Sequence, residues 1–255
     1  MIPDSYFLNR KMKMKIFLIF LLVITFGGFC QAEANSSEII KVNGVNLSVK
    51  EAGTGSAMIL LHGKGYSKEY MDSLFNYYSD RFHVFSYDAR GHGGSDKPES
   101  FTLEDDADDL AGLIEFYNLN KPVIIGFSMG SYITLTAAEK YPGLFSKIVL
   151  IGTRGRGDTY PPERISEAKD KNDAAIIRAL INFDLMTDID KVQIPALLIT
   201  GAEDKTNPPV EGQKVADALS SSRFEVIPNA PHVAFMNEDG RKLVFSYIDE
   251  FLGGK

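Results

Sequence analysis

Short, continuous apolar runs alternate with amphipathic stretches along residues 38–252. Runs of strand length occur at 57–63, 82–88, 121–128, 146–152, 194–201 and 222–229. Val123–Ile125 and Leu197–Ile199 contain no polar position, which is typical of strands covered on both faces of a parallel sheet. Residues 39–53 precede these runs and form two strand-like stretches about Asn43–Gly44, a dipeptide that favours a hairpin turn.

Helical patterns separate these runs. Residues 102–117 begin with Thr102 and carry Asp105 three positions on, a capping-box spacing, and their apolar residues share one face. Residues 131–140 stop at Tyr141–Pro142–Gly143, and residues 241–252 are amphipathic. The alternation predicts an α/β class domain with a mostly parallel, doubly wound sheet and an antiparallel hairpin at its N-terminal edge. The paired carboxylates at 105–106 and 108–109 are expected to face solvent.

One segment interrupts the alternation. Residues 153–191 contain no strand pattern and read as a Gly- and Pro-rich loop with one or two short helices. Insertions beyond strand ends commonly cover active sites. We therefore interpret 153–191 as a short cap insertion within a domain that spans residues 35–255.

The N-terminus has the pattern of a secretory signal. A basic cluster at residues 10–15 precedes the uncharged apolar run Ile16–Phe29, and Ala32 and Ala34 provide a small-x-small cleavage pattern. Fourteen apolar residues are few for a membrane span. We expect residues 1–34 to be a signal peptide and the protein to be secreted or periplasmic. The alternatives are an uncleaved membrane anchor and a lipid attached to Cys30.

Composition excludes several classes of function. The formal net charge of −7 is unsuited to a nucleic-acid partner, which requires a basic surface. Cys30 is the single cysteine and lies inside the expected signal peptide, so a disulfide framework, a cysteine zinc site and a thiol nucleophile are not expected.

The candidate nucleophile is Ser128. It lies in Gly126-Phe127-Ser128-Met129-Gly130, between a predicted strand and a predicted helix, which is the context of a G-x-S-x-G nucleophile elbow. The turn is so tight that a side chain at 126 or 130 would collide with its neighbours. The helix N-terminus favours the negative charge that develops during acyl transfer.

A serine hydroxyl needs a base and a group that orients the base. His232 follows the last predicted strand, where the base is expected for the chain order Ser, acid, His. Asp204 follows the strand at 194–201 and is the preferred acid, with Glu203 as the alternative; a turn-capping role for Asp204 is the structural alternative. His62 and His83 are interpreted as structural residues.

Backbone amides are expected to stabilise the oxyanion. Met129, next to the nucleophile, supplies one N–H, and Lys64 in the loop "HGKG" supplies the other, with Gly65 as the alternative. The side chain of Lys64 is expected to be solvated. Candidates for the lining of the substrate pocket are Tyr66, Phe127, Met129, Phe183, Leu185, Val233 and Phe235. Neither a metal-binding motif nor a phosphate-binding loop is present.

Five motifs occur in one order: "LLHGKG", "YDARGHGGSDKP", "GFSMGS", "LLITGAEDKTNP" and "NAPHVAF". Together they make the chain resemble the α/β-hydrolase fold family, in particular its serine esterases, enol-lactonases and cofactor-free haloperoxidases. The resemblance implies a triad of Ser128, Asp204 and His232 without metal or organic cofactor. It also implies that Arg90 and His92 form a structural turn near the "HGKG" loop. The lysine in that loop and the short cap depart from many relatives.

These observations predict an exported serine hydrolase that cleaves a small-molecule ester or lactone through an acyl-enzyme. Contact with a membrane is expected only through an uncleaved or lipidated N-terminus. One alternative is a cofactor-free perhydrolase that uses the same triad. The other is a non-catalytic ligand receptor on the same scaffold, because a fold alone does not prove catalysis.

Overall fold

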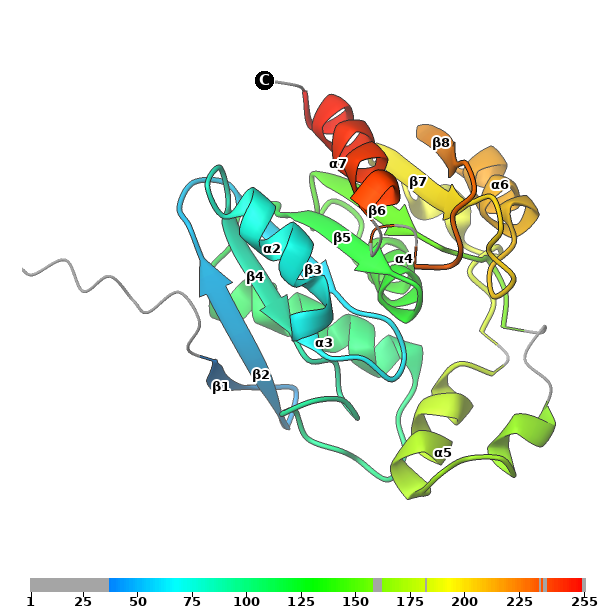
Figure 1. The fold of residues 1–255 in the computed structure, drawn as a ribbon. Helices are drawn as coiled ribbons and strands as arrows, with labels where there is room; N and C mark the ends of the chain where they lie inside the picture. Colours follow the sequence, from blue (N-terminus) through cyan, green and yellow to red (C-terminus); the bar gives the residue numbers. More distant parts are fainter. Residues whose placement is uncertain (1–36, 158–161, 182, 234, 236–237, 254–255) are drawn as a thin grey trace, which may run out of the picture. The chain divides into compact units, whose positions relative to one another are not determined.

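A computed structural model of the chain describes residues 37–157, 162–181, 183–233, 235 and 238–253 (Figure 1). The expected signal peptide, residues 1–34, lies outside the described residues. Of the helices in the described part of the chain, none combines the length and the apolar character needed to span a membrane.

Eight strands form one sheet in the order β1-β2-β4-β3-β5-β6-β7-β8. The strands are β1 (Glu38–Val42), β2 (Val45–Ala52), β3 (Ala57–Leu61), β4 (His83–Tyr87), β5 (Val123–Phe127), β6 (Lys147–Ile151), β7 (Ala196–Gly201) and β8 (Ser222–Ile227). The pairs β1–β2 and β2–β4 are antiparallel, and every other pair is parallel. The predicted sheet and its antiparallel N-terminal hairpin are confirmed.

The hairpin turn is formed by Asn43 and Gly44. Their φ angles are 45° and 81°, so both central residues lie in the left-handed region that a two-residue type I′ turn requires. This turn fixes the register in which Val42 faces Val45. The sequence signal and the observed geometry therefore agree at this edge of the sheet.

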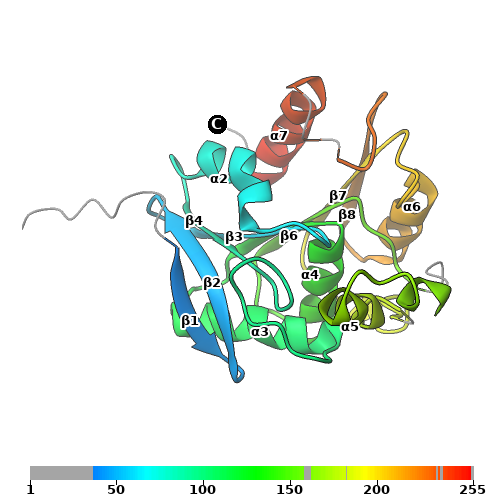
Figure 2. The ribbon, with the colours of Figure 1, turned by 60° about the horizontal axis from the view of Figure 1, so that its bottom comes forward.

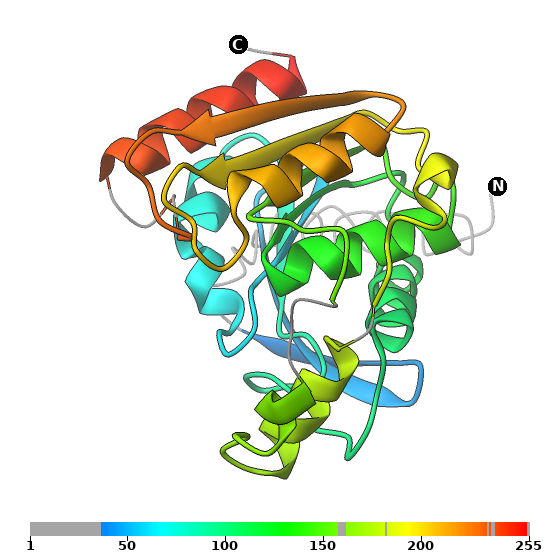
Figure 3. The ribbon, with the colours of Figure 1, turned by 90° about the vertical axis from the view of Figure 1, so that its right-hand side faces the viewer.

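Helices cover both faces of the sheet (Figures 1 and 3). They are α2 (Asp72–Tyr78), α3 (Leu103–Phe116), α4 (Met129–Lys140), α5 (Lys171–Ala179), α6 (Pro209–Ala218) and α7 (Glu238–Leu252), with short 3₁₀ turns η2 (Lys68–Met71), η3 (Pro162–Ile165) and η4 (Ile189–Lys191). One core joins the sheet to α3, α4, α5 and α6, and the other lies between the sheet and α2 and α7. Neighbouring residues of a strand enter different cores, as with Ile124 and Ile125 of β5.

Helix α3 carries buried acids, so the expectation that both carboxylate pairs face solvent is wrong. Asp106 and Asp109 are 2% and 1% exposed. The guanidinium of Arg90 donates two hydrogen bonds to Asp109, at 2.8 and 2.6 Å, and this contact makes the burial possible. Burial, reinforced by the charge of Asp109, raises the pKa of Asp106 well above its ordinary value.

Between β6 and β7, the described residues contain one α-helix, α5, and the two 3₁₀ turns η3 and η4, one helical element more than the one or two expected. No strand lies in the described part of 153–191. A single antiparallel bridge joins Arg156 to Asp184. In Figure 1, helix α5 lies on the side of the sheet toward which the arrows of β5 and β7 point, and Figure 2 shows the same helix from another direction. The carboxyl ends of parallel strands are where α/β sheets bind ligands.

Candidate active site

Ser128 occupies a strained turn between β5 and α4. Its φ of 51° and ψ of −115° place a non-glycine residue in a sparsely populated backbone region. Its N–H donates to the carbonyl of Ile151 in β6 at 2.8 Å, which holds the turn against the sheet. Strain of this kind persists only where the surroundings impose it, and it directs the hydroxyl outward at the end of the strand.

The two glycines of the elbow are required by close backbone contacts. A Cβ at Gly126 would lie 2.3 Å from the carbonyl oxygen of Gly130, and a Cβ at Gly130 would lie 2.5 Å from the carbonyl oxygen of Leu61. Real Cβ atoms do not approach backbone so closely. The expectation that both positions need glycine is confirmed by the structure.

Ser128, His232 and Asp204 form a chain of two hydrogen bonds. Nε2 of His232 is 2.9 Å from Oγ of Ser128, and Nδ1 is 2.6 Å from Oδ2 of Asp204. Because an ionised carboxylate only accepts, the ring proton lies on Nδ1, and Nε2 is free to accept the serine proton. Glu203, the alternative acid, is exposed and takes no part in this chain of hydrogen bonds.

The second oxygen of Asp204 holds its own loop. Oδ1 accepts the backbone N–H groups of Thr206 at 2.8 Å and Asn207 at 2.7 Å. The turn-capping role considered for this aspartate is therefore real, and it coexists with the contact to the imidazole. Oδ1 thus holds the loop, and Oδ2 contacts the imidazole. The aspartate is buried, with 3% of its surface exposed.

Gly152, at the end of β6, leaves space for the imidazole. Its φ is +61°, and a Cβ at this position would lie 2.9 Å from Cε1 and 3.1 Å from Nδ1 of His232. The same Cβ would lie 3.5 Å from Oδ2 of Asp204. A side chain here would displace the imidazole from its hydrogen bonds with Ser128 and Asp204.

Asn207 was not anticipated from the sequence, and it connects the acid loop to two other elements. Its Nδ2 donates to the hydroxyl of Tyr132 at 2.7 Å and to the carbonyl of Gly152. Its Oδ1 accepts from Nε of Arg154. Both residues are buried, Asn207 at 0% and Arg154 at 5% exposure. A buried amide with such partners fixes a loop, but the sequence offers only its position three residues after the acid.

The loop at residues 62–68, called the 62–68 loop below, lies beside Ser128. A Cβ at Gly63 would be 3.3 Å from Cβ of Ser128. The N–H of Tyr66 donates to the carbonyl of Gly63 at 3.2 Å, and Gly65 has a φ of 77°, so Lys64 and Gly65 are the central residues of a tight turn. Lys64 and Met129 follow β3 and β5, two neighbouring parallel strands whose carboxyl ends lie at one edge of the sheet.

The side chain of Lys64 is not solvated as expected. Its Nζ lies 3.0 Å from Oδ1 of Asp173 in α5, and the two side chains are 26% and 24% exposed. The expectation was wrong because a carboxylate of the cap segment, 109 positions further along the chain, approaches the loop. The 62–68 loop and the cap are therefore directly connected.

The candidate lining residues fall into two groups. Tyr66, Phe127 and Phe235 join Tyr70 in an aromatic cluster, in which the Phe127 ring lies 5.1 Å from the rings of both Phe235 and His232. Phe127 and Phe235 are fully buried, Tyr66 is 40% exposed, and half-buried Val233 packs against the same core. This group lies next to the imidazole.

The second group lies along α4. The ring of Phe183 contacts that of Tyr132 at 4.9 Å, and Leu185 is 3% exposed. Both residues border a cavity of about 370 Å³ beside Thr136 and Glu139, in the second half of the helix that Met129 begins. Leu185 belongs to the core on the α3 and α4 side, and no described contact joins it to the candidate triad.

The other histidines contact structural groups. His62 is fully buried, its Nδ1 lies 2.8 Å from the carbonyl of Gly63, and its Nε2 accepts the N–H of Ala89 at 3.1 Å. Burial, and then the charge of His92, lowers the pKa of His62 to about 4. His83 contacts Glu51 at 2.6 Å. Nδ1 of His92 lies 3.0 Å from the carbonyl of Arg90.

Among the residues that the structure describes, no three His, Cys, Asp or Glu side chains are grouped to hold a metal ion. In the described part of the chain, the imidazole of His232 contacts the hydroxyl of Ser128, and the carboxylate of Asp204 contacts that imidazole. Together with the turn amides, these groups can take a proton from a hydroxyl and can donate hydrogen bonds to an oxyanion.

A family model described as alpha/beta hydrolase fold matches residues 56–188, just over half of the chain. The chain belongs to the α/β-hydrolase fold family. The resemblance expected from the sequence motifs is thereby confirmed.

Two curated relatives are hydrolases. A 2-(acetamidomethylene)succinate hydrolase of Mesorhizobium japonicum is 38% identical over 116 residues, which cover 45% of this chain and 42% of that protein. The chain thus matches less than half of that relative's length. The human serine hydrolase BPHL is 26% identical over 234 residues, covering 77% of this chain and 80% of that protein.

Solved structures share the fold. An esterase from Thermogutta terrifontis gives a TM-score of 0.76 at 24% identity and covers 86% of this chain and 98% of that one. The enol-lactonase from Burkholderia xenovorans gives 0.76 at 20% identity, covering 84% and 99%. A bromoperoxidase from Bacillus anthracis gives 0.75 at 21% identity, covering 85% and 99%.

Proposed function

We propose that this protein is a serine hydrolase that cleaves a small carboxylic ester or lactone through an acyl-enzyme on Ser128. The proposal rests on two consecutive hydrogen bonds. Oγ of Ser128 lies 2.9 Å from Nε2 of His232, and Nδ1 of His232 lies 2.6 Å from Oδ2 of Asp204. The strained backbone of Ser128 at a helix N-terminus supports the same role. The likeness to an esterase and an enol-lactonase supports substrates in which an acyl C–O bond breaks.

The first half-reaction transfers the acyl group to the serine. Oγ of Ser128 attacks the carbonyl carbon while Nε2 of His232 takes the hydroxyl proton, and Asp204 stabilises the imidazolium. The amides of Lys64 and Met129 donate to the oxyanion of the tetrahedral intermediate. When the intermediate collapses, the C–O bond to the leaving group breaks, and the imidazolium returns the proton to the departing oxygen.

The second half-reaction regenerates the enzyme. Water loses a proton to His232 and attacks the acyl carbon, and the acid product leaves as Ser128 recovers its proton. For a lactone, the leaving hydroxyl and the acyl group belong to one molecule. The product is then a single hydroxy acid.

Replacement of Ser128 by alanine tests the proposal. The Ser128→Ala variant is expected to fold as the wild type does and to lose both hydrolysis of short p-nitrophenyl esters and labelling by a fluorophosphonate. Ser131→Ala is the matched control, because this buried serine lies one turn away and donates only to the carbonyl of Ser128. If Ser128→Ala retains most of the activity, the proposal is wrong. Ligand-induced stabilisation without labelling of the wild type would favour the receptor alternative.

A perhydrolase is the second candidate, favoured by the likeness to a bromoperoxidase. Hydrogen peroxide would replace water, so that an acetyl-enzyme releases peracetic acid, which then oxidises bromide. Bromination of a phenol indicator should then require both peroxide and acetate and should disappear in Ser128→Ala. Bromination without a carboxylate would contradict this candidate.

We also propose that the protein is exported, on the basis of the basic cluster, apolar run and Ala32-x-Ala34 pattern at its N-terminus. N-terminal sequencing of protein recovered outside the cytoplasm is expected to start at Asn35. A retained N-terminus would indicate the membrane anchor, and a mature chain that begins at a lipidated Cys30 would indicate a lipoprotein.

A further inference from the structure

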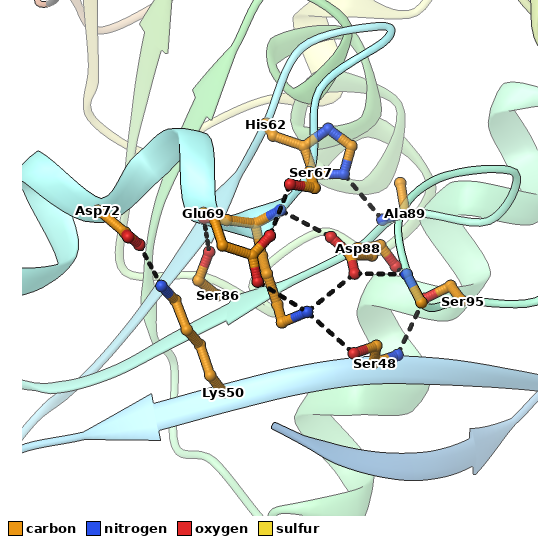
Figure 4. A network of polar contacts seen from close by, with 12 residues as sticks. Ser48, Lys50, His62, Ser67, Glu69, Asp72, Ser86, Asp88, Ala89 and Ser95 are labelled. Atoms are coloured by element: carbon orange, nitrogen blue, oxygen red, sulfur yellow. Dashed lines mark hydrogen bonds and ion pairs between the residues drawn. The ribbon is translucent and has the colours of Figure 1, made fainter. Parts of the chain in front are cut away.

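Two consecutive residues after β4 hold both ends of the 62–68 loop (Figure 4). The backbone N–H of Ala89 donates to Nε2 of His62 at 3.1 Å, at the start of the loop. The carboxylate of Asp88 binds Lys68 at the end of the loop. The turn that carries the amide of Lys64 therefore lies between two anchors on the same strand end.

Asp88 is a fully bonded, buried carboxylate. Its Oδ1 accepts the backbone N–H of Lys68 at 2.6 Å. Its Oδ2 accepts Nζ of Lys68 at 2.9 Å and the N–H of Gly94 at 2.9 Å. Main chain and side chain of the same lysine thus bind the two oxygens of one carboxylate, which fixes both the position and the orientation of the loop end.

Lys68 is buried as an ion. Its side chain is 6% exposed and that of Asp88 is 1% exposed. Nζ also lies 3.0 Å from Oγ of Ser48 in β2 and 3.1 Å from Oε1 of Glu69, so its three protons have three acceptors. Burial lowers and the contacts with Asp88 raise the pKa of Lys68, and the net shift is upward, so the side chain remains a cation.

Such a pair is an expensive way to stabilise a fold. Apolar residues of similar volume often stabilise a fold as much as a buried ion pair does. A buried ion pair is better at holding the chain in one defined arrangement. An oxyanion donor needs this specificity, because its N–H must meet the oxygen at about 2.7–3.1 Å. The buried pair lies four residues from the amide of Lys64.

We propose that Lys68 is a positioning residue for the proposed hydrolysis: by binding Asp88, it sets the 62–68 loop so that the amide of Lys64 meets the oxyanion. Lys68 does not touch the substrate in this proposal. The inference rests on the proposed function, because an oxyanion forms only if Ser128 attacks an acyl carbon.

The test compares two buried lysines. Lys68→Met removes the ammonium and keeps an unbranched side chain that is one atom shorter. Lys50→Met is the matched control, because Lys50 is equally buried at 5% exposure, lies in β2 and pairs with Asp72 of α2 instead of with Asp88 (Figure 4). Lys68→Met is expected to lower kcat for a p-nitrophenyl ester by about 10–100-fold with KM within about twofold. Lys50→Met is expected to keep the wild-type kcat.

The affinity for a phenyl trifluoromethyl ketone distinguishes a positioning role of Lys68 from a merely structural one. Its adduct with Ser128 carries an oxyanion, so its affinity should fall in Lys68→Met by the same factor as kcat. Equal kcat values in the two folded lysine variants, or an unchanged affinity for the ketone, would overturn the proposal.

A milder variant covers the case in which Lys68→Met does not fold. Ser48→Ala removes one hydroxyl acceptor of the ammonium and keeps the ion pair, and it should lower kcat by a few-fold at constant KM. An unchanged kcat in this variant, when Lys68→Met is unfolded, would also overturn the proposal. Failure of the proposed function is distinguishable, because the wild type itself would then lack esterase activity that depends on Ser128.

Discussion

Nζ of Lys64 lies 3.0 Å from Oδ1 of Asp173, so the 62–68 loop is joined to the first turn of α5. The preceding residue, Asn172, donates to the carbonyl of Gly91 at 2.8 Å. Two consecutive residues of α5 therefore fasten the cap to two loops at the carboxyl end of the sheet. Because the amide of Lys64 is a candidate oxyanion donor, one residue connects the cap to the proposed reaction centre.

Asp173→Asn is expected to change catalysis more than stability. The pair is partly exposed, so its loss should change the free energy of unfolding by less than about 1 kcal/mol. The KM for an ester should change several-fold, because the cap and the loop no longer restrain each other. In 1 M salt, the wild type should approach the variant, since salt screens the pair.

Lys191→Met is the control for this prediction. Lys191 forms an exposed pair with Asp188 in the same cap segment, with side chains 51% and 53% exposed. Steady-state kinetics at low and high salt should be unchanged in this variant. Equal kinetic effects of the two substitutions would contradict a specific role for the Lys64–Asp173 pair.

Gly152→Ala is expected to separate backbone strain from damage to the site. The φ of Gly152 is +61°, and the added methyl would meet the imidazole of His232. Gly143→Ala is the control, because Gly143 has a φ of +82° and nothing within 4 Å of the added Cβ. Thermal unfolding should show a similar loss of about 1–2 kcal/mol in both variants. Only Gly152→Ala should lose kcat, by about 10²-fold, and equal activity would refute the clash.

Asp204→Asn is expected to identify the acid of the proposed triad. The amide cannot hold the proton of His232 on Nδ1 as the carboxylate does, so kcat should fall by about 10⁴-fold while KM changes little. Glu203→Gln alters the exposed neighbour and should keep the wild-type kcat. The result would be inconsistent with the proposed assignment if Glu203→Gln were the more damaging change.

His62 makes stability depend on pH in a defined window. Burial lowers its pKa from 6.5 to about 4, so the unfolded chain binds a proton at a higher pH than the folded protein does. The contribution of neutral His62 to the free energy of unfolding is fully present above about pH 6.5 and is lost as the pH falls through about 4. The loss amounts to about 3 kcal/mol. His62→Gln keeps an oxygen that can accept the N–H of Ala89 and does not titrate. Urea unfolding between pH 8 and 4 should show a smaller decline in this variant, and a decline equal to that of the wild type would exclude His62 as its source.

The sequence predicts those parts of the fold and the site that depend on local patterns and chain order. The elbow at Ser128 is a short motif with glycines at fixed positions, and His232 and Asp204 follow strands whose carboxyl ends share one edge of the sheet. Helices α2 and α6 were missed. The first has seven residues, and the second has ten and contains Gly212 in its interior, so neither shows a strong helical pattern.

Contacts between distant segments could not be predicted. Asn207 and Arg154 are 53 positions apart, and each is an ordinary polar residue until folding brings the two together. The same holds for Asp109, whose burial depends on Arg90 in the loop after β4. A single sequence gives the residue types but not these partners. The signal peptide at residues 1–34 stays a prediction.

The adjacency of β6 and β7 has a practical consequence. The cap leaves the sheet at one strand and returns at its immediate neighbour, so its length can change without altering the pairing of any strand. Gly152 and Arg154 must be retained, because they contact the imidazole and the acid loop. A foreign segment grafted between residues 156 and 188 would therefore keep the order of the strands, and it would need to replace the contacts that Asn172 and Asp173 make with the loops of Gly91 and Lys64.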